Sequence, residues 1–346
     1  MMKAYSVFFA NYTIGEDAYG QVPQVCLPFG KRIFLIGGRR AMDAAEGLLG
    51  KALEGSGLVV LESVEFGAKE LGADMIFGVG GGKALDTAKG AAERAGLPVF
   101  TFPTIAATCA ATTALSVVYR EDGNFDSFYF YDKPARHCFI NTRVIADAPC
   151  EYLRAGMGDT MGKFFECHFA ARGDHLDHSS ALGREISNLC YGPLLEHGVQ
   201  ALVDCRRHEP SFALQQAVLA NIVSTGMVSL MVLDDYNCAI AHSVYYGLVL
   251  LPGFEEKYLH GDVVAYGVLV QLAVDKDWDR MREVKGFLKE LGIPSTLREM
   301  EVPLDREYLR DVLRETVTGP DMEHIPYPVT EDMIFEAMRE VEELEG

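Results

Sequence analysis

Several features that would assign this chain to a familiar class are absent from its sequence. None of the eight cysteines belongs to a Cys-x-x-Cys pair, so we expect reduced thiols and no cysteine-based zinc site. No apolar run reaches the length of a membrane span, and the N-terminus lacks the small-residue cleavage site of a secretory signal. We therefore expect a cytoplasmic protein without a membrane partner.

Positive charge is also scarce. The chain has 31 Lys and Arg against 50 Asp and Glu, which gives a formal net charge of −19. Such a surface repels nucleic acid and anionic membranes, so we expect neither as a partner. With 346 residues, 49% of them hydrophobic, the chain is too long for one ordinary core. We expect two domains, 1–150 and 151–346, because helical periodicity takes over after Pro149.

Short apolar strands alternate with helical patterns in the N-terminal part. Strands are predicted over 31–36, 59–61, 75–79 and 98–102, helices over 39–53 and 66–71, and a short hairpin or a meandering strand within 5–27. This alternation is typical of a Rossmann-like parallel sheet with helices on both faces, where ligands bind beyond the carboxyl ends of the strands.

A hairpin and a helical region follow this alternation. We predict hairpin strands over 115–119 and 127–131, and a strand over 138–141 that closes the sheet. Helices are then predicted over 151–172, 179–196, 211–231, 236–249, 260–274, 277–291, 305–316 and 330–344. The expected fold class is thus an α/β nucleotide-binding domain followed by an all-α domain.

Three consecutive glycines, Gly80 to Gly82, stand between an apolar strand and a helical pattern. Glycines let backbone N–H groups approach an anion, while the helix dipole and Lys83 add positive charge. The pattern is neither a P-loop nor Gly-x-Gly-x-x-Gly, because Lys83 stands where the third glycine of that fingerprint would fall. The turn is a candidate pyrophosphate cradle, and a plain tight turn is the alternative.

Two histidines and one aspartate form a second candidate site. His242 stands in an apolar helical pattern, His260 opens the next one, and Asp159 lies near the start of an earlier helix. Two imidazoles and one carboxylate with an open fourth position suit a catalytic Zn²⁺ or Fe²⁺ ion. The alternative is that each histidine is a hydrogen-bonded core residue.

Six sequence blocks, taken in order, resemble one family. They are Gly80-Gly81-Gly82-Lys83-x-x-Asp86-x-x-Lys89, Pro103-Thr104-Ile105-Ala106-Ala107-Thr108, the run ending at Tyr119, Gly156-Met157-Gly158-Asp159, Ala241-His242 and His260-Gly261. In order and spacing they are similar to the glycerol dehydrogenase group of the iron-containing alcohol dehydrogenase superfamily. The resemblance implies a dehydroquinate synthase-like architecture, with the active site in a cleft between a nucleotide-binding and a helical metal-binding domain, and a homo-oligomer.

The same resemblance implies roles for individual residues. Asp159, His242 and His260 would be the metal ligands. The cofactor would be held by Gly81, Gly82, Lys83 and Asp86 at the pyrophosphate, by Thr104 on the adenine side, and by Thr113, Leu115 and Tyr119 at the nicotinamide. The implied reaction is a metal-dependent, NAD(P)-linked hydride transfer at a CH–OH carbon of a small molecule.

Two positions depart from the glycerol dehydrogenase pattern. Cys109 stands where that group has an aspartate that contacts the polyol, and Tyr245 stands where it has a second histidine. Both changes remove polar groups that suit a triol. The loop around Cys109 and the stretches 264–271 and 324–330 look more like the hydroxycarboxylate dehydrogenase branch, which implies reduction of 2-oxo acids to 2-hydroxy acids.

The position of Lys163 supports the hydroxycarboxylate dehydrogenase branch on physical grounds. Lys163 follows Asp159 by one helical turn, so both side chains project from one face, where an ammonium group could bind a substrate carboxylate. The alternatives are a solvated lysine or a salt bridge to Glu166. Cys109 is favoured as a small packing residue over a chemical role, and Tyr245 either lines the substrate pocket or packs.

Cofactor choice can be argued from the end of the first long strand. NAD enzymes commonly place an acidic residue there to accept the ribose hydroxyls, whereas a 2′-phosphate needs an arginine nearby. Gly38 and Arg39 follow this strand without an acidic residue, which favours NADP(H) over NAD(H). Arg39 and Arg40 could instead simply be solvated residues in the first turn of a helix.

Three rival functions remain open at this point. A glycerol, polyol or simple alcohol dehydrogenase would share every site except substrate selection. A lyase of the dehydroquinate synthase type would use a similar fold, but it is expected to carry more Lys and Arg in the cleft. A non-catalytic nucleotide sensor would keep the glycine turn and lose the metal or hydride geometry, although all three candidate metal ligands are present.

Overall fold

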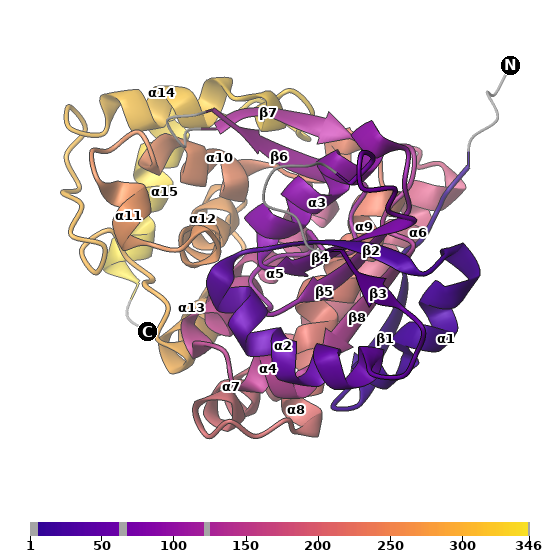
Figure 1. Ribbon diagram of the computed structural model, residues 1–346. Helices are drawn as coiled ribbons and strands as arrows, with labels where there is room; N and C mark the ends of the chain where they lie inside the picture. The colour runs from indigo at the N-terminus through magenta and orange to yellow at the C-terminus, as the bar shows by residue number, and fades with distance from the viewer. Residues whose placement is uncertain (1–5, 62–67, 121–124, 345–346) are drawn as a thin grey trace, which may run out of the picture.

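The computed structural model describes residues 6–61, 68–120 and 125–344 (Figure 1). Its N-terminal part contains a six-stranded sheet in the order β1-β8-β5-β4-β2-β3, and every neighbouring pair of strands is parallel. The strands are β1 (Asn11–Gly15), β2 (Arg32–Gly37), β3 (Val59–Val60), β4 (Met75–Gly80), β5 (Val99–Pro103) and β8 (His137–Asn141). The predicted parallel sheet is confirmed.

Helices cover both faces of this sheet. Alternate residues of β4 face opposite sides: Phe77 packs in one core cluster with Leu49 of α2 (Arg39–Leu53), and Ile76 packs in another with Ala88 of α3 (Gly82–Ala95). Every residue of β4 is buried, as expected for a central parallel strand. The sheet therefore holds the glycine turn rigidly at the carboxyl end of β4.

The hairpin forms a separate sheet. β6 (Leu115–Tyr119) and β7 (Phe125–Phe130) pair antiparallel, and the hairpin lies beside α3, where the hydroxyl of Ser116 donates to the carbonyl of Asp86 at 3.2 Å (Figure 1). The strand that we expected to close the sheet does not lie at its edge. β8 lies inside the main sheet, between β1 and β5, and β1 takes the edge position.

Two local predictions in this part are wrong. Among the described residues of this stretch, 6–27, only β1 forms a strand, and short helices follow it: η1 (Ala18–Gln21), α1 (Val22–Cys26) and η2 (Leu27–Phe29). Pro23 and Pro28 stand in the first turns of α1 and η2, where proline favours helix initiation. The helix expected over 66–71 falls partly on residues 66 and 67, outside the described residues, and 68–72 form a turn.

The rest of the described chain is helical. After the short helix α4 (Thr142–Ala146), the helices are α5 (Cys150–Ala170), α6 (His178–Ile186), η3 (Ser187–Cys190), α7 (Gly192–Arg206), α8 (Phe212–Val218), η4 (Leu219–Ser224), α9 (Thr225–Met231), η5 (Asp234–Tyr236), α10 (Ile240–Leu248), α11 (Phe254–Lys257), α12 (His260–Val274), α13 (Trp278–Leu291), α14 (Arg310–Thr318), η6 (Pro320–Met322) and α15 (Glu331–Glu343). The single helix expected over 179–196 is broken into α6, η3 and α7, and Pro193 stands in the first turn of α7. The division of the chain at residue 150 stays a prediction.

One stretch passes a length and composition test for a membrane span. Phe212–Met231 is long and apolar enough, which contradicts our expectation that no run reaches that length. However, 67% of its most apolar window is buried inside the protein, and core helices of soluble proteins pass the same test. The stretch therefore gives only weak evidence for a membrane span.

Candidate active site

Three helices touch backbone to backbone around the three predicted metal ligands. A Cβ on Gly261 of α12 would lie 1.8 Å from the carbonyl oxygen of Ala155 in α5, and a Cβ on Gly158 would lie 2.3 Å from the carbonyl oxygen of Gly261. A Cβ on Gly267 would lie 2.3 Å from the carbonyl oxygen of Ala241 in α10. Only glycine permits these approaches, so the glycines bring α5, α10 and α12 close together.

The helix contacts bring Asp159, His242 and His260 together. Oδ1 of Asp159 lies 3.4 Å from Nε2 of His242 and 3.4 Å from Nε2 of His260. One ligand atom from each residue lies within 4.8 Å of the others. We call these three residues the metal cluster. Two neutral imidazoles and a carboxylate meeting at one point fit a divalent transition metal with room for a substrate oxygen.

Glu166, which the sequence analysis treated only as a possible partner of Lys163, fixes the orientation of His242. Nδ1 of His242 donates to Oε2 of Glu166 at 2.5 Å, and Oε1 accepts the backbone N–H groups of Ala239 and His242 at 2.8 Å. The carboxylate is fully buried. It therefore turns the lone pair of Nε2 toward Asp159, as carboxylates that accept from the second ring nitrogen of a metal-binding histidine do. Glu166 follows Asp159 by two helical turns, and this spacing was the signal in the sequence that could have placed it beside the metal ligands.

The metal cluster favours positive charge at its centre. Burial alone would raise the pKa of Asp159, but hydrogen bonds from His242 and His260 hold it well below its usual range. Burial would likewise lower the pKa of His242, but the acidic groups of Cys238, Glu166 and Asp159 raise it well above its usual value. This electrostatic environment suits a bound cation.

Lys163 lies beside the metal cluster and is 8% exposed, so it is not a solvated lysine. Its Nζ donates to the backbone carbonyl of Asn237 at 2.7 Å and to Oδ1 of the same residue at 3.1 Å, rather than to Glu166. Burial would lower the pKa of Lys163, but Cys238, Cys109 and nearby carboxylates raise it. The structure therefore shows neither a solvated lysine nor a salt bridge to Glu166, and Lys163 is a buried cation.

Cys109 and Tyr245 also lie at this site. Burial raises the pKa of Cys109 to about 11, and the charges of Asp159 and Lys163 both act on the thiol, so it is a neutral neighbour of the metal cluster. The ring of Tyr245 packs edge-on against the ring of His260, with 4.3 Å between centroids. The role of both side chains in a substrate pocket stays a prediction.

The glycine turn lies at the carboxyl end of β4, before α3. Gly80 ends β4 with φ of 147°, a conformation that favours glycine, and Gly81 caps α3. A Cβ on Gly81 would lie 2.6 Å from Cδ1 of Ile105, and the N–H of buried Thr104 donates to the carbonyl of Gly80 at 3.2 Å. The turn and the following loop therefore pack together at the carboxyl edge of the sheet.

Other predicted cofactor residues are more dispersed. Lys83 is exposed on the first turn of α3, and Gly38 and Arg39 are exposed at the start of α2. Asp86 is buried and paired with Lys89 at 2.9 Å, so its partners are inside the protein rather than at the turn. Thr113 is buried and Leu115 half-buried near the start of β6. Tyr119 ends β6, and its side chain lies outside the described part.

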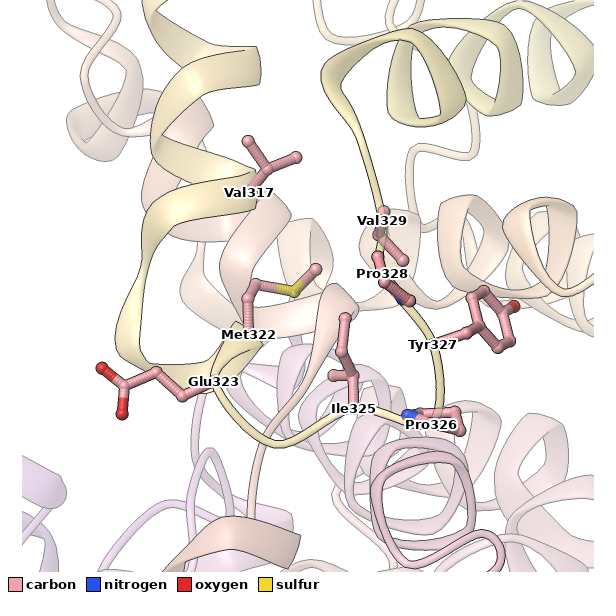
Figure 2. A pocket seen from close by; sticks show the side chains of 8 residues that line it. All are labelled: Val317, Met322, Glu323, Ile325, Pro326, Tyr327, Pro328 and Val329. Atoms are coloured by element: carbon pink, nitrogen blue, oxygen red, sulfur yellow. The ribbon is translucent and has the colours of Figure 1, made fainter.

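Two pockets open on the surface of the described part of the protein, and neither is lined by a residue of the metal cluster. Figure 2 shows a pocket of about 380 Å³ after α14, into which Met322 and Ile325 project, and no residue of the metal cluster lines it. A smaller pocket of about 210 Å³ is lined by residues that include Leu115 and Asp234. Burial and the neighbouring Asp235 raise the pKa of Asp234, and the charge of Lys163 acts in the opposite direction.

Comparisons with known proteins decide the family. The model of the family described as iron-containing alcohol dehydrogenase matches residues 10–137. Hydroxycarboxylate dehydrogenase A of Escherichia coli (strain K12) is 35% identical over 90% of this chain and 89% of the relative. The chain belongs to the iron-containing alcohol dehydrogenase family. The family resemblance seen in the sequence is thereby confirmed.

Further relatives of the dehydrogenase agree. Glycolaldehyde reductase of Halobacterium salinarum is 33% identical over 87% of this chain and 86% of the relative. The crystal structure of glycerol dehydrogenase from Schizosaccharomyces pombe superposes with a TM-score of 0.87 at 26% identity, covering 98% of this chain and 91% of that one. The protein is thus an oxidoreductase, a metal-dependent alcohol or polyol dehydrogenase that uses a nicotinamide dinucleotide and a divalent metal, iron or zinc.

Proposed function

We propose that the dehydrogenase reduces 2-oxo acids to 2-hydroxy acids. The observation that carries this proposal is the buried ammonium of Lys163 on the same face of α5 as Asp159. Two of its three N–H donors are used by Asn237, so one donor remains for a substrate carboxylate. A 2-oxo acid carries its carboxylate directly on the carbonyl carbon, which matches a cation placed beside the metal cluster.

Asp159, His242 and His260 would hold the divalent metal ion. When bound, the ion acts as a Lewis acid on the substrate oxygen. Glu166 keeps His242 oriented for this role, while Cys109 and Tyr245 shape the substrate pocket. The relative named hydroxycarboxylate dehydrogenase A, 35% identical to this chain, supports the substrate class.

The cofactor would lie at the carboxyl edge of the sheet. Backbone N–H groups at Gly81 and Gly82, with Lys83, would bind the pyrophosphate, because the first turn of α3 offers unpaired donors and a positive dipole end. Thr104, Thr113, Leu115 and Tyr119 would contact the adenine and nicotinamide ends. The nicotinamide supplies the hydride. Asp86 contributes only indirectly, through its ion pair with Lys89.

We further propose a preference for NADP(H). β2 ends at Gly37, and Gly38 and Arg39 follow it, exposed and without an acidic side chain to repel a 2′-phosphate. The ratio of kcat/KM for NADPH and NADH tests this directly. Arg39→Ala should lower the ratio about tenfold, since a charge-assisted hydrogen bond is lost, and an unchanged ratio would contradict the proposal.

A cytoplasmic homo-oligomer completes the proposed picture. All eight cysteines are free, which is typical of a reducing compartment. Large apolar side chains are exposed on the N-terminal segment and on β7, including Phe8, Phe9, Tyr129 and Phe130, and such patches commonly mark subunit contacts. The mass of the native protein in solution would test the oligomer.

The decisive experiment is a substrate panel with metal-loaded protein. Oxidation of NADPH and NADH is followed against pyruvate, 2-oxobutanoate, 2-oxoglutarate, dihydroxyacetone and simple aldehydes, with Lys163→Ala as variant and exposed Lys257→Ala as matched control. We expect turnover of 2-oxo acids and a KM for them that rises roughly tenfold to a hundredfold in Lys163→Ala only. Turnover of dihydroxyacetone or aldehydes alone would instead make the enzyme a polyol or alcohol dehydrogenase.

Glycerol or another polyol is the second candidate substrate. The relatives from Thermotoga maritima and Schizosaccharomyces pombe are named glycerol dehydrogenases, and they share the fold and family with this chain. The family assignment favours an oxidoreductase over a lyase or a nucleotide sensor. The same substrate panel separates the polyol from the oxo acid.

A further inference from the structure

Lys89 is a buried lysine of α3 to which the sequence analysis gave no role. It is 3% exposed, and its Nζ lies 2.9 Å from Oδ1 of Asp86 and 2.8 Å from the carbonyl oxygen of Ala110, to which it donates. It also donates to the carbonyl of Leu115, and Oγ1 of Thr113 lies at 3.5 Å. An ammonium taken out of water needs such partners, so these acceptors are held in place around it.

Apart from Asp86, all these acceptors belong to residues 109–115, which comprise the last part of the connection from β5 to β6 and the first residue of β6. We call this segment the loop 109–115. The loop is also tied to the sheet and to the helical part of the protein. Thr101 in β5 donates through Oγ1 to the carbonyl of Ala111 at 2.8 Å, and Thr112 donates through Oγ1 to the carbonyl of Ile222 at 2.5 Å. Gly226 accommodates Thr112, because a Cβ there would lie 2.0 Å from its hydroxyl. The loop therefore spans the boundary between the two parts.

The two ends of this loop lie at the two proposed sites. Cys109 begins it beside Asp159 and Lys163, whose charges act on the thiol. Leu115 ends it at the start of β6, where we place the nicotinamide contacts. The helix that carries Lys89 itself begins at Gly82, in the glycine turn. One buried ammonium thus connects the cofactor cradle, the substrate pocket and the hairpin.

Asp86 strengthens the same connection. Its Oδ2 accepts the backbone N–H of Val117 at 3.2 Å, and its own carbonyl accepts the hydroxyl of Ser116. The Ser116 hydroxyl also accepts from Tyr131 at 2.9 Å. The pair Asp86 and Lys89 therefore holds the loop at one side and the first residues of β6 at the other.

We propose that Lys89 is a positioning residue that fixes the loop 109–115 and thereby sets the distance between the nicotinamide and the substrate at the metal cluster. This inference rests on the proposed hydride transfer. Hydride transfer requires the reacting atoms to lie about 3–3.5 Å apart, so a shift of the loop by about 1 Å can cost roughly a hundredfold in rate. Lys89 acts on this geometry without touching substrate.

The test compares Lys89→Met with the double variant Lys89→Met/Asp86→Asn. Methionine keeps most of the side-chain volume without the charge, and asparagine removes the carboxylate charge that would otherwise stay buried and unpaired. We expect kcat to fall about a hundredfold in both variants, while both KM values change less than about threefold and metal content stays at the wild-type level. Lys89→Arg should recover part of kcat, because it restores the cation.

Hydrogen exchange supplies a readout that needs no turnover. Peptides covering 104–117 should exchange faster in both variants, whereas peptides covering α5 and α12 should keep their protection. NADPH should protect 109–115 in the wild type and not in Lys89→Met. Equal protection by NADPH, faster exchange throughout the chain, or a kcat within about threefold of wild type in the double variant would each overturn the proposal. If the wild type turns over no oxo acid, the proposed substrate fails, and the exchange data still decide the role of Lys89.

Discussion

The two candidate sites of this dehydrogenase are built in opposite ways. The candidate cofactor cradle is one contiguous turn, Gly80 to Gly82, whose proposed binding groups belong to the backbone. The metal cluster consists of side chains from three helices, and its glycines do not face a ligand but other helices. A site made of backbone groups can therefore be predicted from a short stretch of sequence. A site made of side chains depends on how helices far apart in the sequence pack together.

The largest effect should come from the metal cluster itself. His242→Ala removes one of three candidate ligands and the partner of Glu166, so metal content should fall to a small fraction. We expect kcat to drop roughly a thousandfold or more, since Lewis-acid catalysis contributes several kcal/mol. NADPH binding, measured by fluorescence, should stay near the wild-type value. If NADPH affinity fell as strongly as metal content, the cofactor cradle and the metal cluster would not be independent sites.

The second largest effect should come from Gly261, at the contact between α5 and α12, and it should appear in the stability of the protein. Gly261→Ala places a Cβ where only 1.8 Å separates it from the carbonyl oxygen of Ala155, so α5 and α12 must move apart. We expect a loss of about 3 kcal/mol or more in the free energy of unfolding, together with weaker metal binding. Denaturant titration measures the first and metal titration the second.

Gly286 provides the matched control for that substitution. It lies inside α13, and nothing stands within 4 Å of a Cβ built on it. Gly286→Ala should stabilise the protein by about 0.5–1 kcal/mol, because alanine is the better helix former. If both substitutions had the same effect, the glycines at the metal cluster would not be needed for helix approach.

Glu166→Gln tests how much the metal cluster depends on one hydrogen bond, the one between His242 and Glu166. The amide keeps nearly the same size but loses the negative charge that orients His242. We expect metal affinity to fall about tenfold to a hundredfold, with the fold retained. Competition with a chromogenic chelator measures this affinity. Unchanged affinity would show that Glu166 serves only the backbone N–H groups of Ala239 and His242.

The smallest effect is expected in the N-terminal part, at the amino ends of the inner strands β2 and β4. Asp74 accepts backbone N–H groups of Lys31 and Arg32 at 2.9 Å and pairs with the Arg32 side chain at 3.0 Å, and the hydrogen bonds from Arg32 hold its pKa well below the usual range. A depressed carboxyl pKa stabilises the fold above about pH 4 and loses that contribution as the pH falls. Asp74→Asn should therefore lower Tm slightly at pH 7.

The pH dependence supplies the control for this last prediction. The difference in Tm between wild type and Asp74→Asn should shrink as the pH drops below about 4, where the unfolded carboxyl is already protonated. A difference that grows toward low pH would have the wrong sign for a depressed pKa. NADPH binding at neutral pH should be the same in both proteins.

Much of the fold could be predicted from the sequence because its signals are local. The runs 39–53 and 260–274 were bounded correctly, since apolar periodicity and the flanking residues are enough to mark them. The helix expected over 305–316 begins only at Arg310, and α10 begins at Ile240 rather than 236. The place of β8 inside the sheet could not be predicted either, because strand order depends on contacts between residues far apart in sequence.

The same distinction applies to the candidate site. Local motifs and the family resemblance identified Asp159, His242 and His260 as a set. The partner of Lys163 could not be predicted, because Asn237 lies on another element. The ion pair of Asp86 could not be predicted either: the motif assigned Asp86 to the cofactor, which stays a prediction, and its carboxylate is paired with Lys89 inside the protein.

The glycine contacts among α5, α10 and α12 have a consequence for selectivity by ionic radius. A coordination cage usually adjusts to a larger ion by letting its supporting elements move outward. Here the elements already touch main chain to main chain, and the whole of α12 beyond its first residue is buried. Small ions with bonds near 2.0–2.2 Å suit such a cage, and Ca²⁺, which needs about 2.3–2.6 Å and six or more oxygens, does not. We therefore expect helix packing, and not donor chemistry alone, to exclude the larger ion.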